Sequence, residues 1–236
     1  ENIIARIVRA VTPRAGEHLV EIGPGQGALT QPLLEALGEA GQLSLIEIDR
    51  DLVSILEKTF ARTANVKLIQ ADALSFDFLP LATNKKPLRI VGNLPYNIST
   101  PILFHLLKNR TLIKDMHFML QREVVDRLGA APGTKAYGRL SVMIQYHCRV
   151  MPLIPVPPES FRPAPKVQSA VVRLKPHKRM PCVAEDELLL SKIVAQSFQM
   201  RRKTLRNCLK PYAEHLTTVA EVIDMGRRPE QLSVKD

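Results

Sequence analysis

HLVEIGPGQGALTQPLLEALGEAGQLSLIEID, residues 18–49, is the stretch that decides the fold class. It contains an apolar strand, a glycine-rich loop, a stretch with apolar residues three and four apart, and a second apolar strand. The same alternation continues in RDLVSILEKTFA (50–61), VKLIQAD (66–72), LRIVGN (88–93) and DMHFML (115–120). Strands that alternate with helices indicate βαβ units. We therefore expect an α/β fold, with a mostly parallel sheet and helices on both faces.

The chain changes character after this region. VMPLIPVPPESFRPAPKV (150–167) carries so many prolines that we expect a rigid, extended surface loop and not a helix or a central strand. SAVVRLKP (169–176) looks like one more strand, and DELLLSKIVAQSFQMRRKTLRNCLK (186–210) is helical in pattern. We place a domain boundary near residue 178. The expected division is a larger domain over 1–178 and a small helical C-terminal domain over 179–236.

Composition and charge limit the class of protein. The chain has 236 residues, 45% of them hydrophobic, so a packed core is expected. Its net charge of +10 is uneven, with +2 over residues 1–138 and +8 over residues 139–236. Such a charge favours a polyanionic partner, nucleic acid above all, although a basic soluble surface would look similar.

Several features point to the compartment. No apolar run reaches the length of a membrane span, and no signal-peptide pattern is visible. The three cysteines are an odd number and lie far apart in the sequence, which favours a reducing compartment. No Cys-x-x-Cys or closely spaced His pair is present, so we expect no structural metal. We expect a cytoplasmic protein.

The glycine loop indicates a ligand at the end of the first strand. Gly23, Gly25 and Gly27 allow a tight turn and a close approach of the backbone to a ligand, although an ordinary glycine turn has the same composition. Glu47 closes the second strand, 20 residues after Gly27, where a carboxylate can bind ribose hydroxyls. That acid alone would suit a nicotinamide cofactor equally well.

Two further polar residues end the next strands. Asp72 ends the third, where it could instead cap a helix, and Asn93 ends the fourth. In an open parallel sheet ligands bind across the carboxyl ends of the strands, so these tips would line one crevice with Gly23 and Glu47. Glycines for an amino-acid moiety, an acid for ribose and an acid for an adenine amine fit S-adenosyl-L-methionine. A phosphate cradle would need a Lys-Ser/Thr after the glycines, and none is there.

The four residues Asn93, Leu94, Pro95 and Tyr96 follow the fourth strand. The exocyclic amine of adenine is a poor nucleophile because its lone pair is delocalised into the ring. The Asn93 side chain and the Leu94 carbonyl would accept its two hydrogens, Pro95 would fix the backbone, and Tyr96 would offer a face on which a flipped-out base stacks. A strand-end turn with a buried tyrosine is the alternative.

Eight motifs, in this order, resemble the 16S rRNA adenine N6,N6-dimethyltransferases over nearly the whole chain. They are EIGPGQGALT (21–30), IEIDRDL (46–52), QADAL (70–74), NLPYNIST (93–100), QREVVDRL (121–128), YGRLSVMIQY (137–146), FRPAPKVQSAVV (161–172) and RRKTLRN (201–207). The resemblance implies a Rossmann-like S-adenosylmethionine-dependent methyltransferase. It further implies dimethylation of two adjacent adenosines near the 3′ end of 16S rRNA, in the small (30S) ribosomal subunit, and a role in the biogenesis of that subunit.

The resemblance also assigns roles to residues. The loop of Gly23, Gly25 and Gly27 would hold the methionine part of the cofactor. Glu47 would bind the ribose hydroxyls and Asp72 the cofactor adenine. Their neighbours Ile48 and Ala73 would also belong to the cofactor site. The stretch Asn93–Tyr96 would present the target amine, with Asn93 also bordering the cofactor. Phe161 resembles a second aromatic that closes over the target base, although packing within its loop is the plainer reading.

Two departures from the family pattern are visible at the ends. The family carries a Gln-x-Phe-Leu stretch before its first helix that contributes to the cofactor site, whereas this sequence starts at Glu1-Asn2. That stretch is missing from this sequence or was cut, so no contact is assigned to it here. The sequence ends at RPEQLSVKD (228–236), where the family runs on into a last helix, so we expect the C-terminal domain to be truncated.

QMRRKTLRN (199–207) places a cluster of cations on an expected helix of the smaller domain. Its basic residues are Arg201, Arg202, Lys203 and Arg206. Phosphate contacts position a nucleic acid without reading its sequence, so we expect this helix to belong to an RNA-binding surface. A solvated helix face is the ordinary reading of a charge run.

Other activities fit the sequence less well. A large-subunit rRNA methyltransferase of the macrolide-resistance type tends to carry Ile at position 94, and DNA adenine methyltransferases tend to carry Asp-Pro-Pro-Tyr or Asn-Pro-Pro-Tyr. A nicotinamide-dependent oxidoreductase needs a third glycine one residue later and a catalytic acid–base group. A ribosome assembly factor without catalysis stays open. No dimer seam is visible, so we expect a monomer.

Overall fold

The computed structural model describes residues 2–82, 86–161, 165–216 and 220–236, which form two compact units. The first unit comprises Glu1–Val125 and Met151–Pro176, and the second comprises Asp126–Val150 and His177–Asp236. The change at His177 lies next to the boundary expected near residue 178. The structure also groups Asp126–Val150 with the second unit, whereas the sequence division assigned that segment to the larger domain.

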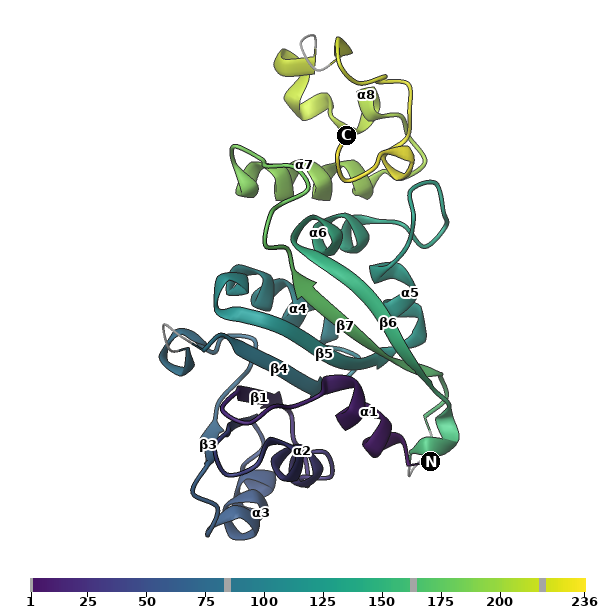
Figure 1. Ribbon diagram of the computed structural model, residues 1–236. Coiled ribbons are helices and arrows are strands. Elements are labelled where there is room, and N and C mark those ends of the chain that lie inside the picture. Colours follow the sequence, from purple (N-terminus) through teal and green to yellow (C-terminus); the bar gives the residue numbers. More distant parts are fainter. Residues whose placement is uncertain (1, 83–85, 162–164, 217–219) are drawn as a thin grey trace. The chain divides into compact units, whose positions relative to one another are not determined.

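The first unit is built on a sheet, which among the described residues has seven strands in the order β3-β2-β1-β4-β5-β7-β6 (Figure 1). The strands are β1 (His18–Ile22), β2 (Gln42–Glu47), β3 (Val66–Gln70), β4 (Leu88–Asn93), β5 (Ile113–Gln121), β6 (Cys148–Val156) and β7 (Ser169–Pro176). β3, β2, β1, β4 and β5 pair in parallel, and β7 pairs antiparallel with β5. The predicted α/β fold with a mostly parallel sheet is confirmed.

The strand order reverses between β1 and β4, which are neighbours in the sheet although β2 and β3 lie between them in sequence. Ile22 is opposite Ile46 on one side and Gly92 on the other. Ligands of open α/β sheets bind outside the carboxyl ends of the strands at such a reversal. The fold therefore provides a binding position at the ends of β1, β2 and β4.

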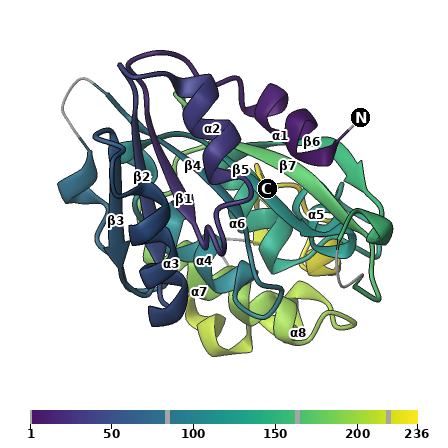
Figure 2. The same ribbon diagram turned by 90° about the horizontal axis from the view of Figure 1, so that it is seen from below.

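Helices cover both faces of this sheet (Figure 1). They are α1 (Ile3–Val11), α2 (Thr30–Leu37), α3 (Arg50–Phe60), α4 (Ser99–Lys108) and α5 (Arg122–Leu128), with the short 3-10 helices Leu79–Leu81, Arg110–Leu112 and Pro158–Ser160. α1, α2 and α3 lie on one face, while α4 and α5 lie on the other. Figure 2 shows α1 and α2 side by side on the first face. The expected helices at 29–40 and 50–61 are confirmed as α2 and α3.

α3 shows how the sequence specifies one of these helices. The Asp49 carboxylate caps its start by accepting the backbone N–H groups of Asp51 and Leu52, at 2.8 and 3.2 Å. Its apolar side chains recur at helical spacing, and Leu56 and Phe60 join the buried cluster beneath α1 and α2. Burial of that face fixes α3 beside β2 and β3.

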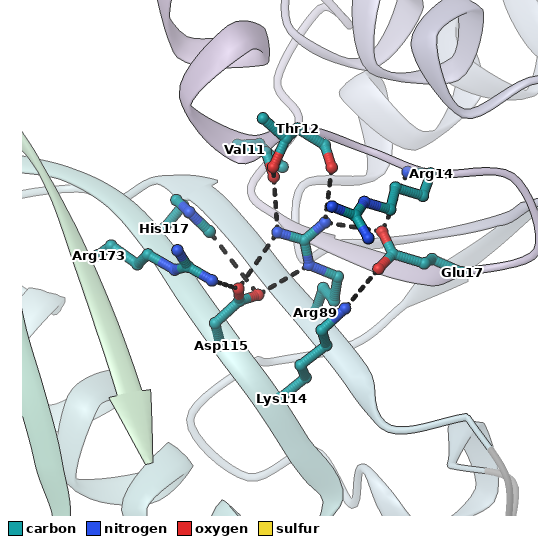
Figure 3. A network of polar contacts seen from close by, with 9 residues as sticks. All are labelled: Val11, Thr12, Arg14, Glu17, Arg89, Lys114, Asp115, His117 and Arg173. Carbon is teal, nitrogen blue, oxygen red and sulfur yellow. Dashed lines mark hydrogen bonds and ion pairs between the residues drawn. The ribbon is translucent and has the colours of Figure 1, made fainter. Parts of the chain in front are cut away.

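A buried arginine ties α1 to the sheet (Figure 3). Arg89 on β4 is 3% exposed, and its guanidinium donates to the backbone oxygens of Val11 and Thr12 at 2.6 and 3.1 Å. These carbonyls end a helix and therefore have no intrahelical partner. The same guanidinium donates to Glu17 at 2.7 Å and to both carboxylate oxygens of Asp115 at 2.8 and 3.2 Å.

Asp115 on β5 is the centre of this network (Figure 3). It is fully buried and also accepts a hydrogen bond from Arg173 on β7 at 2.5 Å, so one carboxylate joins three neighbouring strands. Burial opposes its ionisation, but the hydrogen bonds from Arg89 outweigh this and hold the pKa of Asp115 below its usual value. The nearby His117 is buried, which lowers its pKa to about 4, so this ring is neutral at pH 7.

The expectation of a loop over residues 150–167 is wrong for its first part. β6 (Cys148–Val156) continues through Pro152 and Pro155. β6 is the last strand in the sheet order, so only one side of its backbone pairs, and an edge strand tolerates the missing proline donors. Residues 162–164 of the same stretch lie outside the described residues.

The second unit is mostly helical. It contains α6 (Arg139–His147), α7 (Glu187–Gln199), α8 (Leu205–Cys208) and the 3-10 helices Lys210–His215 and Pro229–Gln231. A small apolar cluster of Leu205, Leu209 and Met225 forms part of its core. Over the described ranges of both units, no helix is long and apolar enough to cross a membrane.

Candidate active site

The carboxyl ends of four parallel strands lie along one edge of the sheet. β1 ends at Ile22, immediately before Gly23, β2 ends at Glu47, and β4 ends at Asn93. β3 ends two residues before Asp72. The parallel register places these ends side by side. The structure thus brings the four strand-end positions expected from the sequence to the same edge of the first unit.

The glycine loop needs residues without side chains for its backbone shape. Gly23 and Gly25 have φ angles of +65° and +59°, the left-handed region that L-residues with a Cβ rarely adopt. A Cβ at either position would meet nothing within 4 Å, so their outer side is open space. The Gly27 backbone is also left-handed, but this residue faces Leu56 and Phe60 of α3. Gly23 and Gly25 therefore present bare backbone to any ligand at this edge.

Glu47 is fixed by backbone amides. It is 6% exposed, and its Oε1 accepts the N–H groups of Ile48 and Asp49 at 2.9 and 3.1 Å. Its Oε2 accepts the N–H of Gly25 at 3.3 Å, which joins the glycine loop to β2. A carboxylate has about four acceptor positions, so three amides leave capacity for a hydroxyl donor. This remaining acceptor capacity fits the hydroxyl groups of a ribose.

Ile48 and the Asp72 region lie beside this carboxylate in sequence or in the sheet. Ile48 is 63% exposed, which is unusual for a large apolar side chain. An aromatic ring of a ligand could pack against it. Asp72 is exposed, and its Oδ1 accepts the N–H of Leu74 at 2.9 Å, which shapes the turn after β3. Ala73 is buried under that turn. The exposed carboxylate of Asp72 can accept a hydrogen bond from an amine.

Asn93–Tyr96 form the turn between β4 and α4. The side chain of Leu94 is 1% exposed and anchors the turn, while its N–H donates to the Met119 carbonyl of β5 at 3.3 Å. Asn93, Pro95 and Tyr96 are exposed on either side of this anchor. Tyr96 is 38% exposed, which excludes the alternative of a buried tyrosine. A polar amide and an aromatic ring are thus presented to solvent by a fixed backbone.

Phe161 follows the 3-10 helix Pro158–Ser160 and is partly buried. It packs against the main apolar cluster of the first unit, which includes Ile154, Val156 and Val171. The contact agrees with the plainer reading of this residue, and a role above a target base stays a prediction.

Glu21 lies on β1 just before the glycine loop, and no role was predicted for it from the sequence. Glu21 is 2% exposed, and its Oε2 accepts the hydroxyl hydrogen of Thr30 at 2.7 Å. Burial, with a smaller contribution from the charge of Glu47, raises the pKa of Glu21 to about 7. The signal in the sequence was a carboxyl group inside an apolar strand, HLVEI.

The expectation that the basic run lies on a helix is wrong. α7 ends at Gln199 and α8 begins at Leu205, so three of the four cations lie in the turn between them. Arg201 pairs with Glu230 and donates to the Thr134 carbonyl at 3.1 Å, within the second unit. Arg202, Lys203 and Arg206 are exposed. These three side chains are available to a polyanion, and Arg201 is engaged in the unit itself.

No group of three or more histidine, cysteine or acidic side chains in the described parts of the chain could hold a metal ion. The polar groups at the strand ends are carboxylate acceptors, backbone amides and an amide side chain, with exposed Ile48 and Tyr96 beside them in sequence. Such a set suits an uncharged ribose and a flat base better than a phosphate, which would need cations.

Comparisons with known proteins give the family. The family model for ribosomal RNA adenine dimethylase matches residues 1–236. The chain is 54% identical to the ribosomal RNA small subunit methyltransferase A of Pseudomonas putida, over 99% of this chain and 86% of that protein. It is 56% identical to the protein of the same name from Chromohalobacter salexigens, over 100% of this chain and 84% of that protein.

Solved structures agree with this match. A dimethyladenosine transferase from Plasmodium falciparum has a TM-score of 0.79 and 25% identity, covering 98% of this chain and 91% of that one. The 23S rRNA methyltransferase ErmE has a TM-score of 0.70 and 25% identity, covering 97% and 93%. The chain belongs to the ribosomal RNA adenine dimethylase family.

Proposed function

We propose that this protein is an S-adenosyl-L-methionine-dependent rRNA adenine N6,N6-dimethyltransferase. Its substrate is 16S rRNA in the small (30S) ribosomal subunit, where it dimethylates two adjacent adenosines near the 3′ end and contributes to the biogenesis of the subunit. The observation that supports this most is the edge shared by the glycine loop, Glu47 and the exposed Asn93–Tyr96 turn. One strand edge thus carries both a nucleoside-type cofactor position and an amine-binding turn.

The cofactor-binding residues are Gly23, Gly25, Gly27, Glu47, Ile48, Asp72, Ala73 and Asn93. Bare backbone at Gly23 and Gly25 leaves space for the methionine part, and the remaining acceptor capacity of Glu47 suits the ribose. Exposed Ile48 provides an apolar surface for the adenine, and the carboxylate of Asp72 accepts from its amine. When bound, S-adenosyl-L-methionine supplies an electrophilic methyl group, and S-adenosyl-L-homocysteine is the product.

The target amine is made nucleophilic by its acceptors. The Asn93 side-chain oxygen and the Leu94 carbonyl each accept one amine hydrogen, which draws the nitrogen toward tetrahedral geometry and localises its lone pair. Leu94 is held by its buried side chain and by the bond from its N–H to Met119, so its carbonyl is fixed before substrate arrives. Fixed acceptors of this kind contribute through positioning and through hydrogen bonds that strengthen in the transition state. Pro95 restricts the turn, Tyr96 stacks on the flipped-out base, and Phe161 closes over it.

The second unit supplies cations for the RNA backbone. Exposed Arg202, Lys203 and Arg206 contact phosphates, with Arg201 at the edge of the same segment. The excess of positive charge over residues 139–236 supports this assignment. We propose that the protein acts as a monomer. We also propose that it acts in the cytoplasm, because bacterial ribosomal subunits assemble there.

A large-subunit substrate is the second candidate, because ErmE is named as a 23S rRNA methyltransferase. The match to ErmE is 25% identical, while the relatives named as small subunit methyltransferases are 51–56% identical. Leu94 also departs from the Ile that the macrolide-resistance enzymes tend to carry. The small subunit is therefore the favoured substrate.

Methyl transfer to undermodified small subunits tests the proposal. Labelled S-adenosyl-L-methionine is expected to give dimethyladenosine in the small-subunit RNA and no label in large-subunit RNA. Asn93→Ala is expected to lower the rate roughly a hundredfold or more, because one fixed partner of the transition state is lost. Asn109→Ala, the same change at the end of α4, is the matched control. Binding of cofactor and subunits without transfer by the wild type would show an assembly factor instead of an enzyme.

A further inference from the structure

The hydroxyl of Tyr96 is not free. It lies 3.0 Å from the Oγ of Ser169, the first residue of β7, in a hydrogen bond between residues 73 positions apart in sequence. Ser169 is 1% exposed, so its hydroxyl is held in the protein and not in water. A buried hydroxyl needs a partner, and the Tyr96 hydroxyl provides one.

Ser169 is a rigid anchor because the sheet fixes it. β7 pairs antiparallel with β5, with Ser169 opposite Gln121, and β5 pairs with β4, with Met119 opposite Asn93. The residue before Ser169 is also held, since the Gln168 carbonyl accepts the N–H of Arg122 at 2.9 Å. The anchor for the Tyr96 hydroxyl therefore lies on β7, in the same sheet as β4, which carries Asn93.

Tyr96 is held at its backbone as well. The hydroxyl of Ser99, a residue that is 2% exposed, donates to the Tyr96 carbonyl at 3.1 Å. Both ends of the residue are thus tied to buried serines, while 38% of it stays exposed. With its backbone held by Ser99 and its hydroxyl held by Ser169, the side chain keeps one ring orientation, and only the ring surface is left for a ligand.

We infer that Ser169 is a positioning residue for the methyl-transfer reaction, and that it fixes the ring of Tyr96 in the orientation in which a flipped-out adenine stacks. This inference rests on the proposed function. Because its hydroxyl is already bonded, Tyr96 acts through its ring and not as a proton donor or acceptor. Ordering a mobile aromatic side chain at the moment of binding has a free-energy cost, which the bond to Ser169 removes in advance.

Loss of the Tyr96–Ser169 bond should lower kcat. Docking of the RNA depends on phosphate contacts, which Ser169 does not touch, so KM for the RNA should change little. The flipped base reaches its stacked position after docking, and a loosely held ring would populate the productive arrangement less often. A residue that only stabilised the fold would instead change thermal stability or cofactor affinity.

The test is a double-mutant cycle on undermodified small subunits with labelled S-adenosyl-L-methionine. Ser169→Ala and Tyr96→Phe are each expected to lower kcat roughly two- to tenfold, the range that corresponds to ordering one side chain. The double variant should be no slower than either single variant, because both remove the same hydrogen bond. Ser169→Thr keeps a hydroxyl and should restore most of the rate.

Ser44→Ala is the matched control. Ser44 is also a strand residue and is 1% exposed. The substitution removes its 2.9 Å hydrogen bond to His18, but Ser44 does not contact Tyr96. Its kcat should match the wild type. Cofactor affinity and melting temperature are measured for every variant, and in both Ser169→Ala should match Ser44→Ala, because each variant loses one hydrogen bond of a buried serine.

Two results would overturn the inference while the proposed function stands. One is a Ser169→Ala enzyme whose kcat equals that of the wild type, and the other is additive losses in the double variant. A wild type that binds cofactor but transfers no methyl group would remove the proposed function itself, and the inference with it.

Discussion

Glu21 and Glu47 are two buried carboxyl groups on neighbouring strands, and the charge of Glu47 adds to the effect of burial on Glu21. Glu47 is surrounded by amide donors, whereas Glu21 has the Thr30 hydroxyl as its hydrogen-bond partner. The two carboxyls therefore differ in their environments below the same glycine loop. Glu47 is suited to accept from a ligand, and Glu21 is suited to change its charge near neutral pH.

The raised pKa of Glu21 makes stability depend on pH. Its folded-state value of about 7 lies above the ordinary value of 4.5, so the folded protein binds more protons than the unfolded chain between these values. This contribution to stability is full below pH 4.5 and is lost as pH rises through 7. Relative to Glu21→Gln, which does not titrate, the wild type should lose about 1 to 3 kcal/mol of unfolding free energy between pH 4.5 and 8.

Urea unfolding of both proteins at several pH values measures this difference. Glu57→Gln removes an exposed carboxyl of α3 and serves as the control for the change in net charge. Identical pH profiles for Glu21→Gln and the wild type would show that burial does not raise the pKa of Glu21.

Breaking the buried ion network should cost far more than breaking its exposed part. Arg89→Met leaves Asp115 buried without its main partner and frees the carbonyls of Val11 and Thr12. Loss of one partner of a buried pair costs about 3 to 5 kcal/mol. Lys114→Met breaks the 2.6 Å bond to Glu17, but Lys114 is 44% exposed, and such pairs contribute about 0 to 1 kcal/mol.

Chemical unfolding of Arg89→Met, Lys114→Met and the wild type decides between these values. The Arg89 variant should also release α1 first, visible as faster hydrogen exchange of its amides. Equal destabilisation by the two variants would mean that the network of Figure 3 does not hold α1 to the sheet.

Glu47→Gln should weaken binding of the cofactor without unfolding the protein. The substitution turns an amide NH₂ group toward backbone N–H donors that now face a carboxylate oxygen. It also removes the charged acceptor proposed for the ribose. Hydrogen bonds to charged groups contribute about 1.5 to 3 kcal/mol, so affinity for S-adenosyl-L-methionine should fall at least about tenfold. Calorimetric titration measures this affinity, with Glu57→Gln as the control. An unchanged affinity would show that Glu47 does not bind the ribose.

The strand-end residues could be predicted from the sequence because parallel strands bring their carboxyl ends to one edge. Given the βαβ pattern, the positions of Gly23, Glu47, Asp72 and Asn93 followed from strand length alone. The Tyr96–Ser169 bond could not be predicted in this way. It depends on β7 pairing antiparallel with β5, a long-range choice that no local pattern records.

Two local predictions failed for different physical reasons. Proline content indicated a loop where β6 forms, because an edge position overrides the low strand propensity of Pro152 and Pro155. Helical periodicity ran across residues 200–204, where α7 in fact ends and Thr204 precedes α8. No glycine or proline marks that break, so the basic run was placed on a helix that does not continue.

The cations in the turn between α7 and α8 should differ in their contribution to RNA binding, because one of them is already paired within the protein. Arg202 and Lys203 are exposed, whereas Arg201 is paired with Glu230 and bonded to Thr134. Arg202→Ala or Lys203→Ala should each reduce the slope of log affinity against log salt concentration by about 1, because each removes one phosphate contact. Arg201→Ala should change that slope less and should lower the stability of the second unit instead.

Titrations of small-subunit RNA at several KCl concentrations give the slopes, and thermal unfolding gives the stability. The comparison is informative because all three variants remove the same charge from neighbouring positions, so a general effect of net charge would lower all three slopes equally. Equal slopes would therefore reject the assignment of Arg202 and Lys203 as phosphate contacts. A smaller change at Arg201 alone would show that an intramolecular ion pair, and not position in the sequence, decides which cation of this run meets the RNA.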